Sequence, residues 1–313
     1  MLKIAKLACL ATLCPLLIWA QAASPAHVQV QVMVTVGHHN GHEAPELTRN
    51  ELIVMQGDNP APIANLFPLR GDRAGVELFV LVDNCSNCEP GPIFDELRHF
   101  LISQPSTTLV GVAYIDSGHL RVLENPTQDH ERAVKALSAP AGSKPSSPFI
   151  ALNELIETWT QGSSQRAVLM ISNGIDPSTP PEMLQADRSV EGALRAAQRG
   201  SVTVYAIYHP SADYSSTDTS KVYSGQVQLS HLALETGGEA YFLGFGPMPS
   251  VAPFLADLSD HLANRYLLEF IGHTGSSTLQ RITVKSTNPD VELMVPDRVP
   301  VTARPPLPVS GKD

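Results

Sequence analysis

The sequence lacks any cluster of lysine or arginine. Its 313 residues include 21 lysines and arginines against 31 aspartates and glutamates, which gives a formal net charge of −10. Nucleic acids and anionic membranes bind proteins through basic patches, because their phosphate charges must be neutralised. The composition therefore predicts that neither nucleic acid nor an anionic membrane surface is a partner. A hydrophobic content of 43% is sufficient for a folded core.

Cysteine is also scarce, and two of the four cysteines lie in an N-terminal segment with the features of an export signal. Lys3 and Lys6 precede an apolar run over residues 7–20, which is too short to span a bilayer and is followed by small residues. We expect residues 1–22 to be a cleaved signal peptide. This predicts a secreted or periplasmic protein with no membrane span after cleavage. An uncleaved membrane anchor is the alternative interpretation.

The sequence contains no GxSxG, HExxH, P-loop or GxGxxG motif in a supporting context. Its 11 histidines are scattered along the chain. A hydrolytic set of Asp83, His209 and a serine at position 146 or 147 is conceivable, but the turn that would present a serine nucleophile is missing. We therefore expect a binding protein and not an enzyme.

Hydrophobic periodicity predicts two kinds of strand. Residues 27–36 alternate valine with mainly polar residues, which is typical of a half-buried strand, and residues 279–286 show the same alternation. Residues 75–83 are instead almost continuously apolar, as in a parallel strand that is covered on both faces. From there to residue 264, strands alternate with segments of helical spacing, which predicts a mostly parallel sheet flanked by helices.

The two ends of the chain each supply too few strands for a stable sheet. We therefore expect residues 23–72 and 265–304 to pair into one small β-sandwich, with residues 75–264 inserted between them as an α/β domain. In the alternative arrangement, each end merely extends the α/β sheet. Residues 305–313 are expected to form a flexible tail.

The α/β segment resembles a von Willebrand factor type A domain over residues 75–264. The stretch ELFVLVDNCSN stands where this family has a hydrophobic strand ending in DxSxS. SSPFIALNEL stands where a threonine precedes a helix, and RAVLMISNGID stands where a strand ends in serine or threonine followed by Asp-Gly. The flanking segments resemble the bacterial secreted subgroup of these proteins. The resemblance implies a Rossmann-like fold and an adhesion-type, protein-binding function.

In that family, the DxSxS residues, a threonine and a second aspartate bind Mg²⁺, and the open position of the ion takes a carboxylate from a partner protein. The resemblance places this metal-ion-dependent adhesion site at Asp83, Cys85, Asn87, Ser146 or Ser147, and Asn173. Cysteine sulfur suits Mg²⁺ poorly, and an amide in place of the second aspartate removes a charge that would offset the ion. We expect no cofactor, or weakly bound Mg²⁺. A domain with a functional cation site is the alternative.

Cys85 and Cys88 are the cysteines that remain after signal cleavage. Exported proteins meet oxidising conditions, so a local disulfide between these two residues is expected. A CxxC at the start of a helix is also typical of thioredoxin-like proteins, because the helix terminus lowers a thiol pKa. A thioredoxin-like redox protein is therefore the alternative function. A third interpretation is that the loop is a purely structural strand-to-helix turn.

Ligands of parallel sheets bind beyond the carboxyl ends of the strands. Asp83 stands at such an end, and Asp176 can restore a charge lost from the degenerate cation site. We expect a protein partner to contact the loops over residues 84–92, 142–148, 173–182 and 209–223. The candidate contact residues are Asn84, Ser86, Ser147, Asp176, His209 and Tyr214.

Overall fold

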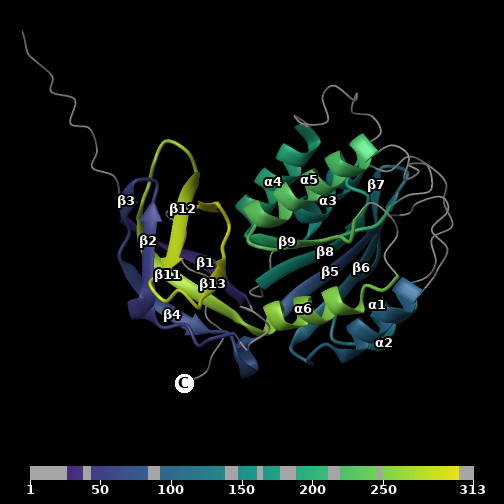
Figure 1. The fold of residues 1–313 in the computed structure, drawn as a ribbon, viewed down its shortest axis with the longest axis horizontal. Coiled ribbons are helices and arrows are strands. Elements are labelled where there is room, and N and C mark those ends of the chain that lie inside the picture. The colour runs from purple at the N-terminus through teal and green to yellow at the C-terminus, as the bar shows by residue number, and fades with distance from the viewer. Residues whose placement is uncertain are drawn as a thin grey trace, which may run out of the picture.

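The computed structural model describes residues 27–37, 44–83, 92–137, 147–160, 165–176, 188–210, 219–244 and 249–302. The chain forms two lobes that lie side by side, one of mixed α/β structure and one of strands (Figure 1). The middle of the sequence forms the α/β lobe. Strands from both ends of the chain, coloured purple and yellow in Figure 1, meet in the other lobe.

The α/β lobe is built on a six-stranded sheet of order β10-β9-β8-β5-β6-β7. Its strands are β5 (Val76–Asp83), β6 (Thr108–Asp116), β7 (His119–Thr127), β8 (Gln165–Ser172), β9 (Val202–Tyr208) and β10 (Ala240–Tyr241). All pair in parallel except β7, which returns antiparallel along β6. Every residue of β5 is buried, as its almost continuously apolar sequence predicts for a strand covered on both faces.

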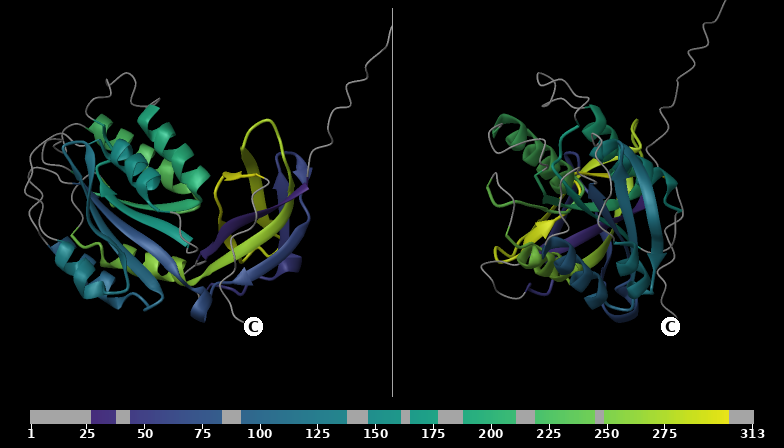
Figure 2. Two further views of the ribbon diagram at one scale, coloured as in Figure 1. Left: turned by 180° about the vertical axis from the view of Figure 1, so that it is seen from behind. Right: turned by 90° about the vertical axis from the view of Figure 1, so that its right-hand side faces the viewer.

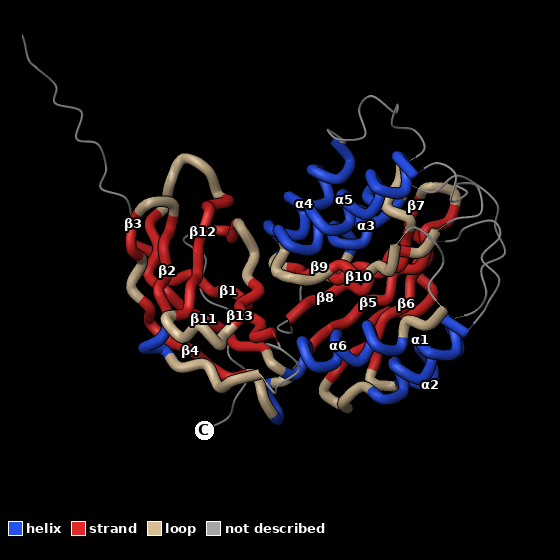
Figure 3. Tube along the Cα trace, in the orientation of Figure 1, coloured by secondary structure: helices blue, strands red, loops and turns tan. Residues whose placement is uncertain are grey.

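Two layers of helices cover the sheet (Figures 2 and 3). One layer consists of α1 (Pro92–Ser103), α2 (His130–Ala136) and α6 (Ala252–Ala263). The other consists of α3 (Pro148–Thr158), α4 (Arg188–Gly200) and α5 (Thr219–Glu235). Along β5, Val80 and Val82 face the first layer, whereas Phe79 and Leu81 face the second. Within the described ranges, no helix has both the length and the apolar composition needed to cross a membrane.

The other lobe is a β-sandwich of two four-stranded sheets, of order β13-β1-β11-β4 and β14-β12-β2-β3. The strands from the N-terminal part are β1 (His27–Gly37), β2 (Leu52–Gln56), β3 (Asn59–Pro60) and β4 (Ile63–Pro68). Those from the C-terminal part are β11 (Arg265–His273), β12 (Leu279–Ser286), β13 (Glu292–Met294) and β14 (Arg298–Pro300). The short 3₁₀ turn η1 (Arg49–Glu51) lies between β1 and β2, and η2 (Gly71–Arg73) lies between β4 and β5 of the α/β sheet.

The sandwich pairs strands from opposite ends of the chain. β1 runs antiparallel to β11, and β2 runs antiparallel to β12. The buried carboxylate of Glu269 in β11 accepts hydrogen bonds from Gln29 at 2.7 Å, Gln31 at 2.8 Å and Asn65 at 2.7 Å. These amides come from both neighbouring strands and so fix the register of the sheet. The predicted fold class, an α/β unit inserted in a β-sandwich made by the chain ends, is confirmed.

Helix α5 begins earlier than the sequence predicts. Residues 219–223 were expected to belong to a loop, but α5 starts at Thr219. Gln226 and Gln228 are buried on this helix together with Val222. These polar residues interrupt the apolar pattern, so the sequence does not predict the first turns of the helix.

Two strands also differ from expectation. β10 covers only two residues of the strand expected over 239–243. The sequence gives no signal for β14, which pairs with β12.

A buried arginine joins the two lobes. Arg265 is the first residue of β11 and follows the end of α6 by two positions. Its guanidinium donates to the carbonyl oxygens of Leu262 at 2.8 Å and Ala74 at 3.0 Å, and to Oε1 of Gln165 at 2.6 Å. Burial lowers the pKa of Arg265 to about 10. The side chain therefore stays charged at neutral pH and is shared among three acceptors.

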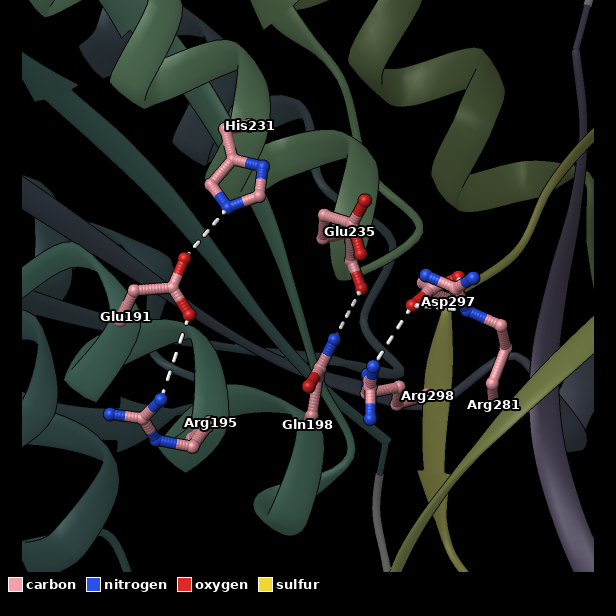
Figure 4. Close-up of polar contacts among 8 residues, drawn as sticks. All are labelled: Glu191, Arg195, Gln198, His231, Glu235, Arg281, Asp297 and Arg298. Atoms are coloured by element: carbon pink, nitrogen blue, oxygen red, sulfur yellow. Dashed lines mark hydrogen bonds and ion pairs between the residues drawn. The ribbon is translucent and has the colours of Figure 1, made fainter. Parts of the chain in front are cut away.

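Polar contacts also connect α4 and α5 to the sandwich (Figure 4). The backbone N–H of Asp297 donates to the carbonyl oxygen of Glu235 at 3.2 Å, and Nε2 of Gln198 donates to the same oxygen at 3.1 Å. Arg281 and Arg298 each approach the Asp297 carboxylate, at 3.1 Å and 3.4 Å. Burial, together with the charge of Asp297, raises the pKa of Glu235. The two lobes thus share a hydrogen-bonded and charged contact.

Candidate functional site

The carboxyl ends of β5, β8 and β9 form one edge of the sheet, which we call the carboxyl edge. Asp83 is the last residue of β5, and Ser172 is the last residue of the neighbouring strand β8. Oγ of Ser172 donates a hydrogen bond to Oδ2 of Asp83 at 2.8 Å. Both side chains are buried. The aspartate therefore takes a hydroxyl partner from the adjacent strand.

The loop that follows β8 is held tightly against α5. Oδ1 of Asn173 accepts from the backbone N–H of Ile175 at 2.8 Å, which is an Asx turn. Gly174 has a φ of 68°, a conformation that favours glycine, and its N–H donates to Oγ of Ser172 at 3.1 Å. A Cβ atom on Gly225 of α5 would overlap the carbonyl oxygen of Asn173. Two glycines thus allow the helix and the loop to touch through their backbones.

A second polar pair lies where three elements of the carboxyl edge meet. Ser147 directly precedes α3, and its Oγ donates to Oδ1 of the buried Asp176 at 3.2 Å. Gly118, in the turn between β6 and β7, comes close to the same hydroxyl, since a Cβ atom at this glycine would lie 3.4 Å from Oγ of Ser147. The sequence left the direction of Asp176 open. In the structure its carboxylate faces the start of α3.

His209 follows β9 and lies next to Ser172, at the end of β8. Its backbone N–H donates to the carbonyl oxygen of Ser172 at 2.9 Å. Burial lowers the pKa of His209. The imidazole is therefore mainly neutral at pH 7 and adds no positive charge to the edge.

The other predicted site residues lie outside the described residues. They are Asn84, Cys85, Ser86, Asn87, Cys88, Ser146 and Tyr214. The disulfide between Cys85 and Cys88, and the second and third positions of the predicted cation site, therefore remain predictions.

Chemically, the described part of the edge offers oxygen atoms. Carboxylate, hydroxyl and amide oxygens are the ligands that Mg²⁺ prefers. The hydroxyls of Ser172 and Ser147 already donate to Asp83 and Asp176, and the amide oxygen of Asn173 faces its own turn. The edge therefore presents two serine–aspartate pairs, each joined by a hydrogen bond.

Ser172 is the residue that the sequence reasoning missed. The motif comparison directed attention to Asn173, which stands one residue beyond the end of the strand. A signal was nevertheless present, because the apolar run of β8 ends in a hydroxyl residue just as the run of β5 ends in Asp83. Parallel strands that are neighbours place such terminal residues side by side.

Comparisons with known proteins match no family model and no curated protein. Among solved structures, the conserved hypothetical protein BatB from Bacteroides thetaiotaomicron has a TM-score of 0.40 at 14% identity, covering 60% of this chain and 98% of its own. Proximal thread matrix protein 1 from the mussel byssus has a TM-score of 0.38 at 16% identity, covering 60% of this chain and 48% of its own. The human COPII-coat protein Sec24c has a TM-score of 0.44 at 9% identity, covering 84% of this chain and 49% of its own. This chain spans about half the length of the last two. At such TM-scores the similarities carry no argument about function.

Proposed function

We propose that this protein is an exported, secreted or periplasmic binding module, whose protein partner docks on the carboxyl edge of the α/β sheet. The observation that carries the proposal is that Asp83, Ser147, Asn173, Asp176 and His209 all lie at this one edge. Among these residues, the sequence resemblance to von Willebrand factor type A domains assigns Asp83, Ser147 and Asn173 to the cation site at which a partner carboxylate binds. We propose binding and not catalysis.

An apolar anchor supports docking at this edge. Ile150, in the first turn of α3 and three residues after Ser147, is 40% exposed. Protein interfaces combine apolar anchors with a polar rim, and the half-buried residues Ser147 and His209 at this edge are polar residues of the kind found at such a rim. The edge therefore offers both components within a small area.

We further propose that the cation site of the family is degenerate in this chain, with weak Mg²⁺ binding or none. The hydrogen bonds of Ser172 and Ser147 support this, because each hydroxyl donates to a carboxylate that an ion would need. The Asn173 amide oxygen, in place of a carboxylate, is engaged by the Ile175 N–H. An ion at this edge would therefore compete with hydroxyl protons for the charge of these carboxylates.

A pair of matched variants tests the docking edge. Mature protein from residue 23 is immobilised and used to capture partners from an envelope extract of the exporting cell, with and without Mg²⁺. Ile150→Gln should remove a captured protein that wild type retains. Ile102→Gln, at a 48% exposed isoleucine near the end of α1, should retain it. Equal capture by both variants would place the docking surface elsewhere.

Calorimetric titration tests the cation site separately. We expect no Mg²⁺ site tighter than about millimolar, the weak end of the affinity scale. A micromolar heat signal that Asp83→Ala abolishes would show that the site is functional, which is the alternative to our proposal.

The redox alternative depends on Cys85 and Cys88 and has a direct test. Thiol labelling of the native mature protein should give no label, and two labels after reduction, if the cysteines form a structural disulfide. A pair that is readily reduced and that reduces insulin would instead support a thioredoxin-like activity.

A further inference from the structure

A cluster of ionisable side chains lies on the α6 side of the sheet, away from the carboxyl edge. Its members are Glu239, Asp257 and His261, whose ligand atoms all lie within 4.8 Å of one another. Nδ1 of His261 is 3.4 Å from Oδ2 of Asp257 and 3.8 Å from Oε2 of Glu239. One imidazole nitrogen and two carboxylates therefore face a common point. We call these three residues the α6 cluster.

Local structure explains how the cluster forms. Asp257 and His261 are four residues apart on α6, so they lie on one face of the helix. Glu239 immediately precedes β10, and its carbonyl oxygen accepts from the N–H of Ala206 in β9 at 2.9 Å. The sheet thus holds the glutamate backbone, and the helix holds the other two side chains.

Two tyrosines orient the cluster. The hydroxyl of Tyr241 donates to Oδ2 of Asp257 at 2.8 Å and lies 3.3 Å from Nδ1 of His261. The ring of Tyr205 stacks on the imidazole with 6.2 Å between ring centroids and 19° between planes. The imidazole is therefore held with Nδ1 toward the carboxylates. Partners of this kind, which orient a ligand without binding the ion, are a regular feature of metal sites.

The burial of the three residues is uneven. The His261 side chain is 4% exposed, whereas those of Asp257 and Glu239 are 37% and 42% exposed. An ion can therefore reach the carboxylates from solvent, and the buried imidazole is fixed behind them. The two carboxylates lie close together beside the imidazole, and a cation between them would offset their like charges.

We propose that the α6 cluster is a binding site for a divalent transition-metal ion of the Zn²⁺ class. A tetrahedral Zn²⁺ with bonds of about 2.0–2.1 Å places its ligand atoms about 3.3 Å apart. The separations of 3.4 Å and 3.8 Å approach that value, and the half-exposed carboxylates can close the remainder. An imidazole ligand suits Zn²⁺ and not Mg²⁺. The fourth position of the ion would take water.

The position of the site indicates a structural role for the ion. It would join the start of β10 to the last turns of α6, and α6 leads directly into β11 of the sandwich. Glu292, one of the residues that raises the pKa of Glu239, belongs to β13 of the sandwich. The site is therefore separate from the docking edge of the proposed function and does not depend on it.

Zn²⁺ titration of the mature protein tests the proposal. We expect wild type to bind one Zn²⁺ with micromolar or tighter affinity by calorimetry, and Zn²⁺ to raise its melting temperature. Glu239→Gln and Asp257→Asn should each weaken binding by at least about tenfold and reduce the thermal shift. Both variants keep the side-chain shape, and a melt without metal checks that each is folded.

Asp260→Asn is the matched control. It removes one carboxylate from an exposed position on α6 outside the cluster, and it should weaken binding by less than about threefold because exposed charges are screened. Zn²⁺ held by other histidines or cysteines of the chain would be unaffected by Glu239→Gln and Asp257→Asn. Unchanged Zn²⁺ affinity in these two variants, or no Zn²⁺ binding by wild type, would overturn the proposal.

Discussion

Two polar clusters at different places on the same α/β lobe hold their carboxylates in different surroundings. At the carboxyl edge, Asp83 and Asp176 are buried, and each accepts a hydrogen bond from a serine. In the α6 cluster, Glu239 and Asp257 are more than one third exposed and lie 3.8 Å and 3.4 Å from Nδ1 of His261, and Asp257 also accepts a hydrogen bond from Tyr241 at 2.8 Å. The carboxylates of the first cluster are buried, whereas an ion can reach those of the second from solvent.

The difference shows that the number of carboxylates does not by itself make a cation site. A carboxylate whose charge is already satisfied by a neighbouring donor gains less from an ion than one held among like charges. The carboxyl edge has the sequence resemblance to a cation site, but the α6 cluster has the more suitable geometry. The following changes test this contrast, in order of decreasing effect.

Gly225→Ala should have the largest effect, because the carboxyl edge is fixed by the backbone contact between α5 and the loop after β8. The added Cβ would overlap the carbonyl oxygen of Asn173, and relieving the overlap must move the helix or the loop. We expect a loss of about 3 kcal/mol in the free energy of unfolding, measured by chemical denaturation. Gly192→Ala is the control: no atom lies within 4 Å of its added Cβ, and in the middle of α4 it should stabilise by about 0.5–1 kcal/mol. Equal effects would show that the contact does not constrain the edge.

Ser172→Ala tests whether the edge is closed by its hydroxyls. The change removes a donor to the buried Asp83 carboxylate and an acceptor for the N–H of Gly174. We expect a loss of about 2 kcal/mol in unfolding free energy, because bonds to charged groups are worth more than neutral ones. Addition of Mg²⁺ should not restore this stability. Recovery in millimolar Mg²⁺ would mean that an ion replaces the hydroxyl and that the edge resembles the α6 cluster.

Glu239→Gln tests the α6 cluster through the pH dependence of the unfolding free energy. The pKa of Glu239 is raised from 4.5 to about 7, so between these values the folded protein holds a proton that the unfolded chain has released. This residue therefore makes the protein less stable as pH rises through that window, and the penalty is complete above pH 7. Solvent screens the 42% exposed side chain, so we expect a contribution of about 1 kcal/mol.

The measurement is the difference in unfolding free energy between wild type and Glu239→Gln at about pH 5 and about pH 8. The variant should be relatively more stable at the higher pH. Glu292→Gln should reproduce only part of the effect, because Glu292 is the least of the three causes of the raised pKa. Parallel pH curves for wild type and Glu239→Gln would contradict the prediction.

Ser147→Ala should have the smallest effect. Ser147 precedes α3 but makes no side-chain cap to the helix, and its hydroxyl donates to Asp176 at 3.2 Å from a half-buried position. We expect a loss of about 0.5 kcal/mol in unfolding free energy. Asp129→Ala, which removes a side-chain cap that accepts from the N–H of Arg132, should cost about 1 kcal/mol. A larger loss at Ser147 than at Asp129 would show that the Asp176 pair closes the edge more strongly than its geometry indicates.

Most of the fold follows from hydrophobic periodicity. The almost continuous apolar run of β5 predicts a central strand, and the spacing of Leu152, Leu155 and Ile156 predicts α3, whose inner face they form. The sandwich follows from the shortage of strands at each chain end. The start of α5 does not follow, because its buried side includes Gln226 and Gln228, and periodicity counts only apolar residues.

The sites were less predictable, for a different reason. Sequence motifs report residues that are close along the chain, such as Asp83 and its following loop. The α6 cluster joins Asp257 and His261 to Glu239, which lies well before them in the sequence. The pairing of β10 with β9 brings Glu239 close to the other two residues. The spacing of four between Asp257 and His261 was visible in the sequence. Its significance required the position of the third ligand.

The hydrogen bonds of Glu269 have a consequence for how the chain is made. Gln29 and Glu269 are 240 residues apart, so the N-terminal strands cannot pair with the C-terminal strands until nearly the whole polypeptide has been synthesised. Contacts of such long range form late and slowly, because the intervening chain must first be ordered or its loop entropy overcome. The inserted α/β unit, which is complete before β11 emerges, shortens that distance by bringing both chain ends to one side. A chain whose synthesis ends before β11 would therefore have unpaired, aggregation-prone edges on its first strands.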